Sequence, residues 1–120
     1  MPLEPRTRII LILPAPTARQ ELKLVNKTLS YLLKLSGGLT ATSSIPSSFD
    51  GWWLNPRTGK LEQEPTLLII ADVPRRLSDP KLLLALDKLK LRCQKDFFQK
   101  IIWLTLHEIQ RVNTDDNVRK

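Results

Sequence analysis

Three stretches of the chain have the hydrophobic pattern of β-strands. Residues 8–13 and 66–73 are nearly continuous aliphatic runs, which are typical of central strands covered on both faces. Residues 100–111 alternate between the two sides of a strand. One side carries Ile102, Leu104 and Leu106, and the other carries Ile101, Trp103, Thr105 and His107. Residues 39–44 form a weaker and more polar stretch, which indicates an edge strand.

Two stretches between these strands repeat their apolar residues at helical spacing. We expect the first helix to start at Thr17, with Gln20 completing a capping box, and to end at Gly37-Gly38. Its predicted buried face consists of Leu22, Val25, Leu29, Leu32 and Leu33. We expect the second helix to begin at Asp79-Pro80, a capping carboxylate followed by a proline. Its predicted buried face consists of Leu82, Leu86, Leu89, Cys93 and Phe97, whereas Leu84 and Leu91 lie off this face.

The order strand, helix, strand, strand, helix, strand predicts the ferredoxin-like α+β fold, a four-stranded antiparallel sheet with two helices on one face. In that fold the first and third strands are central, and these are the two stretches that lack alternation. We expect residues 1–112 to form this single domain, a length that suits one core. Residues 113–120 have no apolar pattern and are expected to be a mobile tail.

Two helices cover only one face of such a sheet. The other face would expose roughly half of both central strands, a larger apolar patch than a soluble monomer usually leaves open. We therefore expect a homo-oligomer, with Ile101, Trp103 and Thr105 at the interface between subunits.

Residues 44–64 join the second predicted strand to the third and contain two adjacent tryptophans beside a glycine. Large aromatic residues are favoured at binding surfaces because they bury much area at a low entropic cost. The turn-forming run 55–60 adds two cations. We expect this loop to contact a small anionic ligand or a protein partner through Phe49, Trp52, Trp53, Arg57, Lys60, Glu62 and Glu64. The alternative for the tryptophans is a role in packing or in the contact between subunits.

The charge of the chain opens a second hypothesis. The net charge is +7 and the isoelectric point is near 9.9, which suits a nucleic acid, an anionic surface or an acidic protein as a partner. Both predicted helices carry a basic stripe suited to phosphate contacts: Arg19, Lys23, Lys27, Lys81, Lys88, Arg92 and Lys95. The alternative is that both stripes are ordinary solvated helix faces. The central strands carry no aromatic residue, which argues against base stacking on an open sheet as in RNA-recognition modules.

Few residues are suited to catalysis or metal binding. The chain has one cysteine, Cys93, and one histidine, His107, which excludes an internal disulfide and a Cys/His zinc site within one subunit. A single thiol is typical of the reducing cytoplasm. A third hypothesis, a metal-dependent enzyme, would use Glu62 and Glu64, which share one side of an extended segment. We assign no catalytic residue, metal or cofactor, and no apolar run approaches the ~20 residues of a membrane span.

The architecture over residues 7–112 resembles the PII-like superfamily. The resemblance implies subunits that form trimers with their sheets inward, and nucleotide binding in clefts between subunits near the base of the 44–64 loop. The segments Gly38-Leu39-Thr40, Gly51-Trp52, Glu64-Pro65-Thr66 and Phe98-Gln99 also resemble a small uncharacterised bacterial family with a Gly-Leu-Thr, Gly-x-Trp and Glu-x-Ser/Thr pattern. The leading hypothesis is therefore a non-enzymatic, PII-like binding or regulatory module.

Overall fold

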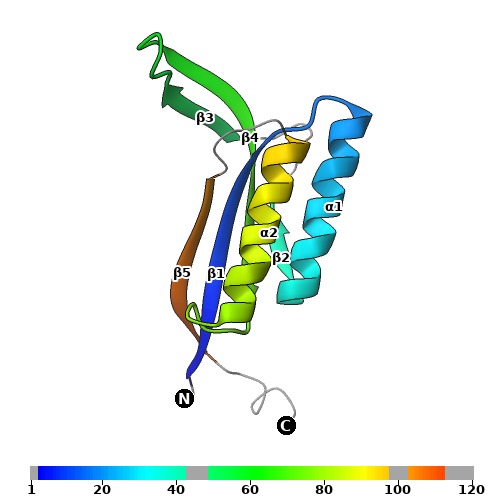
Figure 1. The fold of residues 1–120 in the computed structure, drawn as a ribbon, viewed down its shortest axis with the longest axis vertical. Helices are drawn as coiled ribbons and strands as arrows, with labels where there is room; N and C mark the ends of the chain where they lie inside the picture. Colours follow the sequence, from blue (N-terminus) through cyan, green and yellow to red (C-terminus); the bar gives the residue numbers. More distant parts are fainter. Residues whose placement is uncertain (1–2, 43–48, 98–102, 113–120) are drawn as a thin grey trace.

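The computed structural model describes residues 3–42, 49–97 and 103–112, which form one antiparallel sheet and two helices. The strands are β1 (Leu3–Pro14), β2 (Leu39–Ala41), β3 (Phe49–Leu54), β4 (Leu61–Val73) and β5 (Trp103–Val112). The helices are α1 (Arg19–Ser36) and α2 (Pro80–Asp96). The strand order is β2-β4-β1-β5, and β3 also pairs with β4 (Figure 1). This is the predicted ferredoxin-like arrangement, with β1 and β4 at the centre.

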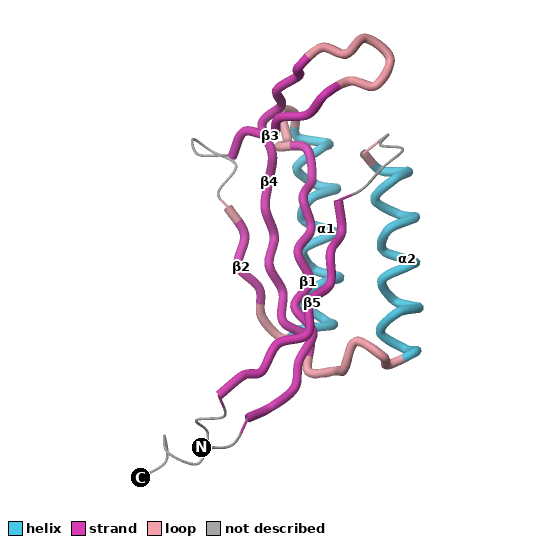
Figure 2. Tube along the Cα trace, turned by 90° about the vertical axis from the view of Figure 1, so that its left-hand side faces the viewer, coloured by secondary structure: helices cyan, strands magenta, loops and turns pink. Residues whose placement is uncertain are grey.

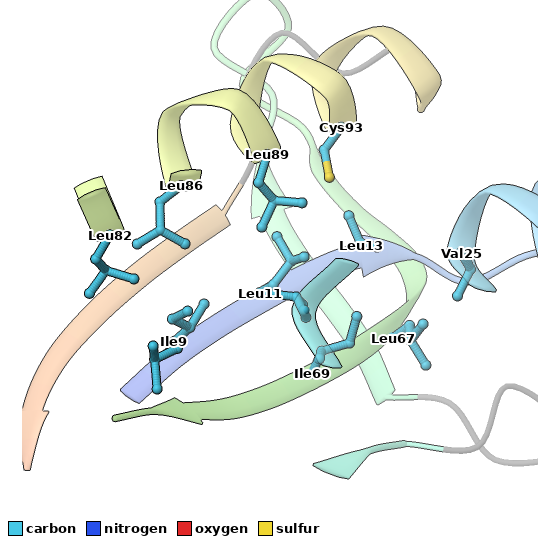
Figure 3. Close-up of a cluster of buried hydrophobic side chains, with 12 residues drawn as sticks. Ile9, Leu11, Leu13, Val25, Leu67, Ile69, Leu82, Leu86, Leu89 and Cys93 are labelled. Carbon is cyan, nitrogen blue, oxygen red and sulfur yellow. The ribbon is translucent and has the colours of Figure 1, made fainter. Parts of the chain in front are cut away.

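Both helices lie against the same face of the sheet (Figure 2). The side chains of β1 and β4 that face the helices are buried, among them Ile9, Leu11 and Ile69. Leu82, Leu86, Leu89 and Cys93 of α2 are buried and point toward the sheet, so the predicted buried face of α2 is confirmed (Figure 3). From β5, Leu104 and Leu106 pack against the same core. The core is therefore a single layer between the sheet and the helices.

The buried face of α1 differs in part from the prediction. Val25 is buried as expected, but Leu22 and Leu33 are 39% and 45% exposed. Thr28 and Ser36 are buried instead, and each hydroxyl donates a hydrogen bond to the backbone carbonyl four residues earlier. Because these hydroxyls form hydrogen bonds within the helix, the two small polar residues can be buried in the core. The buried face of α1 therefore includes Thr28 and Ser36 and leaves Leu22 and Leu33 partly exposed.

The predicted start of α1 is wrong. The N-cap is Ala18, which has no side-chain capping bond, so the helix begins one residue too late for Thr17 to cap it. The Thr17 hydroxyl instead donates to Oε1 of Glu21 at 2.9 Å. Thr17 and Gln20 therefore do not form a capping box.

The other two predicted helix signals are confirmed. Gly37 ends α1 with a φ of 80°, in the left-handed region that a side chain disfavours. At the start of α2, Oδ1 of Asp79 accepts a hydrogen bond from the Lys81 amide at 2.9 Å, and Pro80 follows as the first helical residue.

The largest departure from the prediction lies between residues 44 and 64. The second predicted strand shortens to β2, and residues 49–54 form a strand where a loop was expected. β4 starts at Leu61 and continues beyond the end of β1 into a two-stranded ribbon with β3, here called the β3–β4 ribbon (Figure 1). Pairing lets the two segments satisfy each other's backbone hydrogen bonds. Residues 43–48 and 113–120 lie outside the described residues.

Candidate functional site

The β3–β4 ribbon carries the tryptophans that the sequence singles out. The register places Trp52 opposite Gln63 and Trp53 opposite Glu62. The Trp52 side chain is 59% exposed. Phe49 begins β3, where the ribbon joins the sheet. The ribbon therefore offers aromatic surface beyond the end of the helical layer.

A hydrogen-bonded turn closes the tip of this ribbon. The Asn55 amide donates to the Lys60 carbonyl at 2.9 Å, and the Gly59 amide donates to the Asn55 carbonyl at 2.7 Å. The Asn55 side chain accepts from the Arg57 amide and donates to Glu62 Oε1, both at 2.9 Å. Arg57 and Lys60 are exposed, so an ordered backbone holds two cations at the tip.

Glu62 and Glu64 share one side of β4, as predicted, because they alternate with Leu61 and Gln63. Glu62 accepts the hydrogen bond from Asn55 described above. Within residues 3–42, 49–97 and 103–112, no three His, Cys, Asp or Glu side chains gather closely enough to hold a metal ion. The hypothesis of a metal-dependent enzyme gains no support from these residues.

The face of the sheet away from the helices, here called the open face, carries a continuous apolar strip. Trp103 of β5 stands opposite Ile12 of β1, and Ile12 stands opposite Leu68 of β4. In the next row, Ile10 stands opposite Ile70, and both are half-buried. Trp103 is 64% exposed. The strip crosses three strands of the sheet.

The predicted interface residues lie on this strip where the structure describes them. Thr105 is exposed and stands opposite Ile10, beside Trp103 on the same side of β5. Ile101 lies outside the described residues. His107 is exposed on this side too and stands opposite Arg8.

The predicted phosphate-contacting cations lie on the helices, on the far side from the open face. All are exposed or half-exposed, and they are Arg19, Lys23 and Lys27 on α1 and Lys81, Lys88, Arg92 and Lys95 on α2. None of the seven forms an ion pair with another described residue. Lys88 and Arg92 border a groove of about 280 Å³ between the helices, together with Tyr31 and Leu89. The sequence therefore predicted accessible cations correctly, without showing what they contact.

A depression of about 540 Å³, which the sequence pattern did not predict, lies at the end of the open face away from Trp103. Its charged lining consists of Arg6, Arg8, Asp72 and Arg111, and we call it the arginine pocket. Its β4 residues are Ile70 and Asp72, so the pocket lies at the opposite end of β4 from the ribbon. The sequence feature that could have indicated this pocket is the Arg-Thr-Arg pattern at residues 6–8. Alternate residues of a strand face the same side, so both arginines lie on the open face.

Charge pairing orders this pocket. Nε and Nη2 of Arg8 donate to the two carboxylate oxygens of Asp72 at 2.9 and 3.0 Å. These hydrogen bonds from Arg8 hold the pKa of Asp72 below its usual value, although partial burial acts in the opposite direction. Nη2 of Arg6 donates to the backbone carbonyl of Asp72 at 3.0 Å. The Asp72 side chain is therefore a carboxylate at neutral pH that accepts from Arg8, while Arg6 binds the backbone carbonyl of the same residue.

No protein-family model matches the chain, and no curated protein matches it in sequence. Solved structures match it in fold. CutA1 from Oryza sativa aligns with a TM-score of 0.59 and 15% identity over 95% of this chain and 88% of its own. CPII, a nitrogen regulatory PII-like protein from Thiomonas intermedia K12 bound to ADP, AMP and bicarbonate, aligns with a TM-score of 0.53 and 18% identity over 93% of this chain and 100% of its own. A phage SAM lyase in complex with S-methyl-5'-thioadenosine aligns with a TM-score of 0.53 and 18% identity over 92% of this chain and 91% of its own.

The chain has the fold of the CutA and PII-like proteins. The predicted resemblance to the PII-like superfamily is therefore confirmed at the level of fold. This fold is shared by a regulatory protein and by a lyase, so it does not by itself assign an activity. No helix in the described part of the chain is long and apolar enough to cross a bilayer.

Proposed function

We propose that this protein is a non-enzymatic, PII-like binding module that self-associates through its open face. The observation that carries this proposal is the apolar strip that begins at Trp103, which is 64% exposed, and continues through Ile12 to Leu68. Water contact with a patch of this kind is unfavourable, and covering it stabilises the protein. We therefore expect another apolar surface to bind to the strip and shield it from water.

A second copy of the chain is the cover that the strip fits best. The strip contains no charged residue between the Arg8–Asp72 pair and the ribbon, so copies with a net charge of +7 can meet there. Closed symmetric assemblies bury the same patch on every subunit. We expect a trimer, the state that the PII-like resemblance implies.

The β3–β4 ribbon is the proposed contact for a small anionic ligand or a protein partner. It combines an exposed aromatic side chain, Trp52, with two exposed cations, Arg57 and Lys60. Trp offers flat apolar area and the cations offer hydrogen-bond donors, a combination common at binding surfaces.

The solution molar mass tests the self-association. Light scattering at about physiological ionic strength should give three times the 13.8 kDa of one chain. Trp103→Glu should reduce the mass to that of one chain, because the interface would then bury an unpaired carboxylate. Leu84→Glu is the matched control, since Leu84 is 59% exposed on the opposite layer and should leave the trimer intact.

Circular dichroism establishes that each variant is folded. A wild-type protein that is a monomer would contradict the proposal. A folded Trp103→Glu variant that remains a trimer would show that the strip is not part of the interface between subunits.

A nucleic-acid-binding protein is the second candidate, favoured by the seven accessible helical cations that lack ion pairs within the described residues. Binding of a labelled DNA duplex should weaken by about a thousandfold between ~50 and ~200 mM salt. The double variant Lys88→Glu and Arg92→Glu should abolish it, whereas Arg57→Glu on the ribbon should have a smaller effect. Binding that is insensitive to salt, or absent at low salt, would exclude this candidate.

A further inference from the structure

The arginine pocket brings together three guanidinium groups from two strands that are neighbours in the sheet. Arg6 and Arg8 come from β1 and Arg111 comes from β5. The only acidic groups in contact with them among the described residues are Glu4 and Asp72. Three cations therefore face two carboxylates, and the pocket keeps an excess of positive charge.

The arginines are unequally satisfied. Arg8 forms the two-point pair with Asp72 at 2.9 and 3.0 Å. Arg6 and Arg111 instead share Glu4, and each contact is 3.4 Å long. Charge-assisted hydrogen bonds between nitrogen and carboxylate are usually about 2.7–2.9 Å, so both contacts with Glu4 are weak. Nη2 of Arg6 also donates to the Asp72 carbonyl at 3.0 Å, so Nη1 of Arg6 and the Arg111 guanidinium are the groups available to a stronger acceptor.

Arg6 has an unused donor inside the protein. Its side chain is only 12% exposed, and its Nε is buried without a hydrogen-bond partner among the described residues. A buried donor without an acceptor is costly, and a shift of the Arg6 side chain toward an acceptor in the pocket would offset that cost. The arginine pocket is an open depression of about 540 Å³, so a small anion can reach it from solvent.

We propose that the arginine pocket binds a small oxyanion, that is, a ligand bearing a phosphate or carboxylate group. The guanidinium fork matches the spacing of oxygens in both groups, so Arg6 and Arg111 are the predicted direct contacts. Arg8 positions the site through Asp72. All these residues belong to one subunit, so the proposal does not depend on self-association.

Isothermal titration calorimetry of the full chain at neutral pH and about physiological ionic strength tests this site. Pyrophosphate and malonate are the two probes, and the tighter of them identifies the phosphate or the carboxylate class. Arg111→Gln should weaken binding of the tighter probe by about tenfold or more. Arg6→Lys, which keeps the charge and loses the Nε donor, should also weaken it.

Arg19→Gln is the matched control, because it removes one exposed cation of α1 outside the pocket and should leave binding unchanged. Equal weakening by Arg19→Gln would show that only the net charge attracts the anions, and it would overturn the proposal. Binding of neither probe, or binding that both folded pocket variants retain in full, would overturn it too. Thermal unfolding of each variant establishes that it is folded, and its molar mass separates this result from a failure of self-association.

Discussion

Arg8 and Asp72 stand directly opposite each other on the two central strands, and their side chains form a two-point ion pair at 2.9 and 3.0 Å. The pair closes the polar end of the open face, where the apolar strip stops. It joins β1 to β4 through side chains as well as through the backbone ladder. Because the pKa of Asp72 is lowered by Arg8, the pair also makes the stability of the fold depend on pH.

The first prediction concerns Asp72→Asn. A carboxyl group whose pKa is lower in the folded state stabilises the protein above its unfolded pKa of ~3.9, and this contribution is lost as the pH falls through the folded pKa. The variant should therefore be less stable than the wild type at pH 7, by about 1 kcal/mol or less for a partly exposed pair. The difference should shrink below about pH 4. Urea unfolding at pH 7 and pH 3 measures it, and a difference that is the same at both would contradict the role of ionisation.

The second prediction concerns the reactivity of Cys93. Its side chain is fully buried in the core, and burial raises its pKa to about 11. The thiolate is the reactive form, so the folded protein should react very slowly with a thiol reagent at pH 8. Denatured protein should react completely. Rapid stoichiometric labelling of the folded protein would show that α2 opens far more readily than its packing indicates.

The third prediction compares two leucines of α2. Leu89 is 1% exposed and points into the core, whereas Leu84 is 59% exposed. Leu89→Ala should reduce the free energy of unfolding by about 2–5 kcal/mol, because it leaves a cavity. Leu84→Ala should change it by only about 0.5 kcal/mol. Urea unfolding measures both, and a large loss for Leu84→Ala would indicate that this residue is covered in the assembled protein.

The fourth prediction compares the two glycines after α1. Gly37 has a φ of 80°, whereas Gly38 does not have a positive φ, and a Cβ at either position would meet no atom within 4 Å. Gly37→Ala should cost roughly 1–2 kcal/mol, because an L-residue is disfavoured in the left-handed conformation. Gly38→Ala should be close to neutral. Equal effects on the urea midpoint would mean that backbone conformation does not decide the cost.

Local periodicity predicted most of the fold. The uninterrupted apolar runs at residues 8–13 and 66–73 identified the central strands, and the alternation from Trp103 to His107 separated the core side of β5 from the open side. The capping residue Asp79 gave the start of α2. These features depend on near neighbours in the chain, which is why the sequence reveals them.

The missed features depend on residues that are distant in the chain. Residues 49–54 contain Asp50 and Gly51, which both disfavour a strand, and the segment becomes one by pairing with residues 61–66. Likewise, Arg6 and Arg111 meet only because β1 and β5 are neighbours in the sheet. No local sequence pattern indicates that these two residues are close together in the fold. The predicted binding residues of the ribbon and the predicted interface at Trp103 remain predictions, because their partners lie outside the chain.

β4 belongs to both parts of the molecule. Its first residues, Leu61 to Thr66, pair with β3 in the ribbon, and its residues from Thr66 to Val73 pair with β1 in the sheet. No loop separates the two parts, because β4 is continuous from Leu61 to Val73. Strand twist passes along a continuous backbone. If copies of the chain meet on the open face as proposed, a partner that rotates the ribbon would also turn Leu68 and Ile70, because all of these residues belong to the same strand.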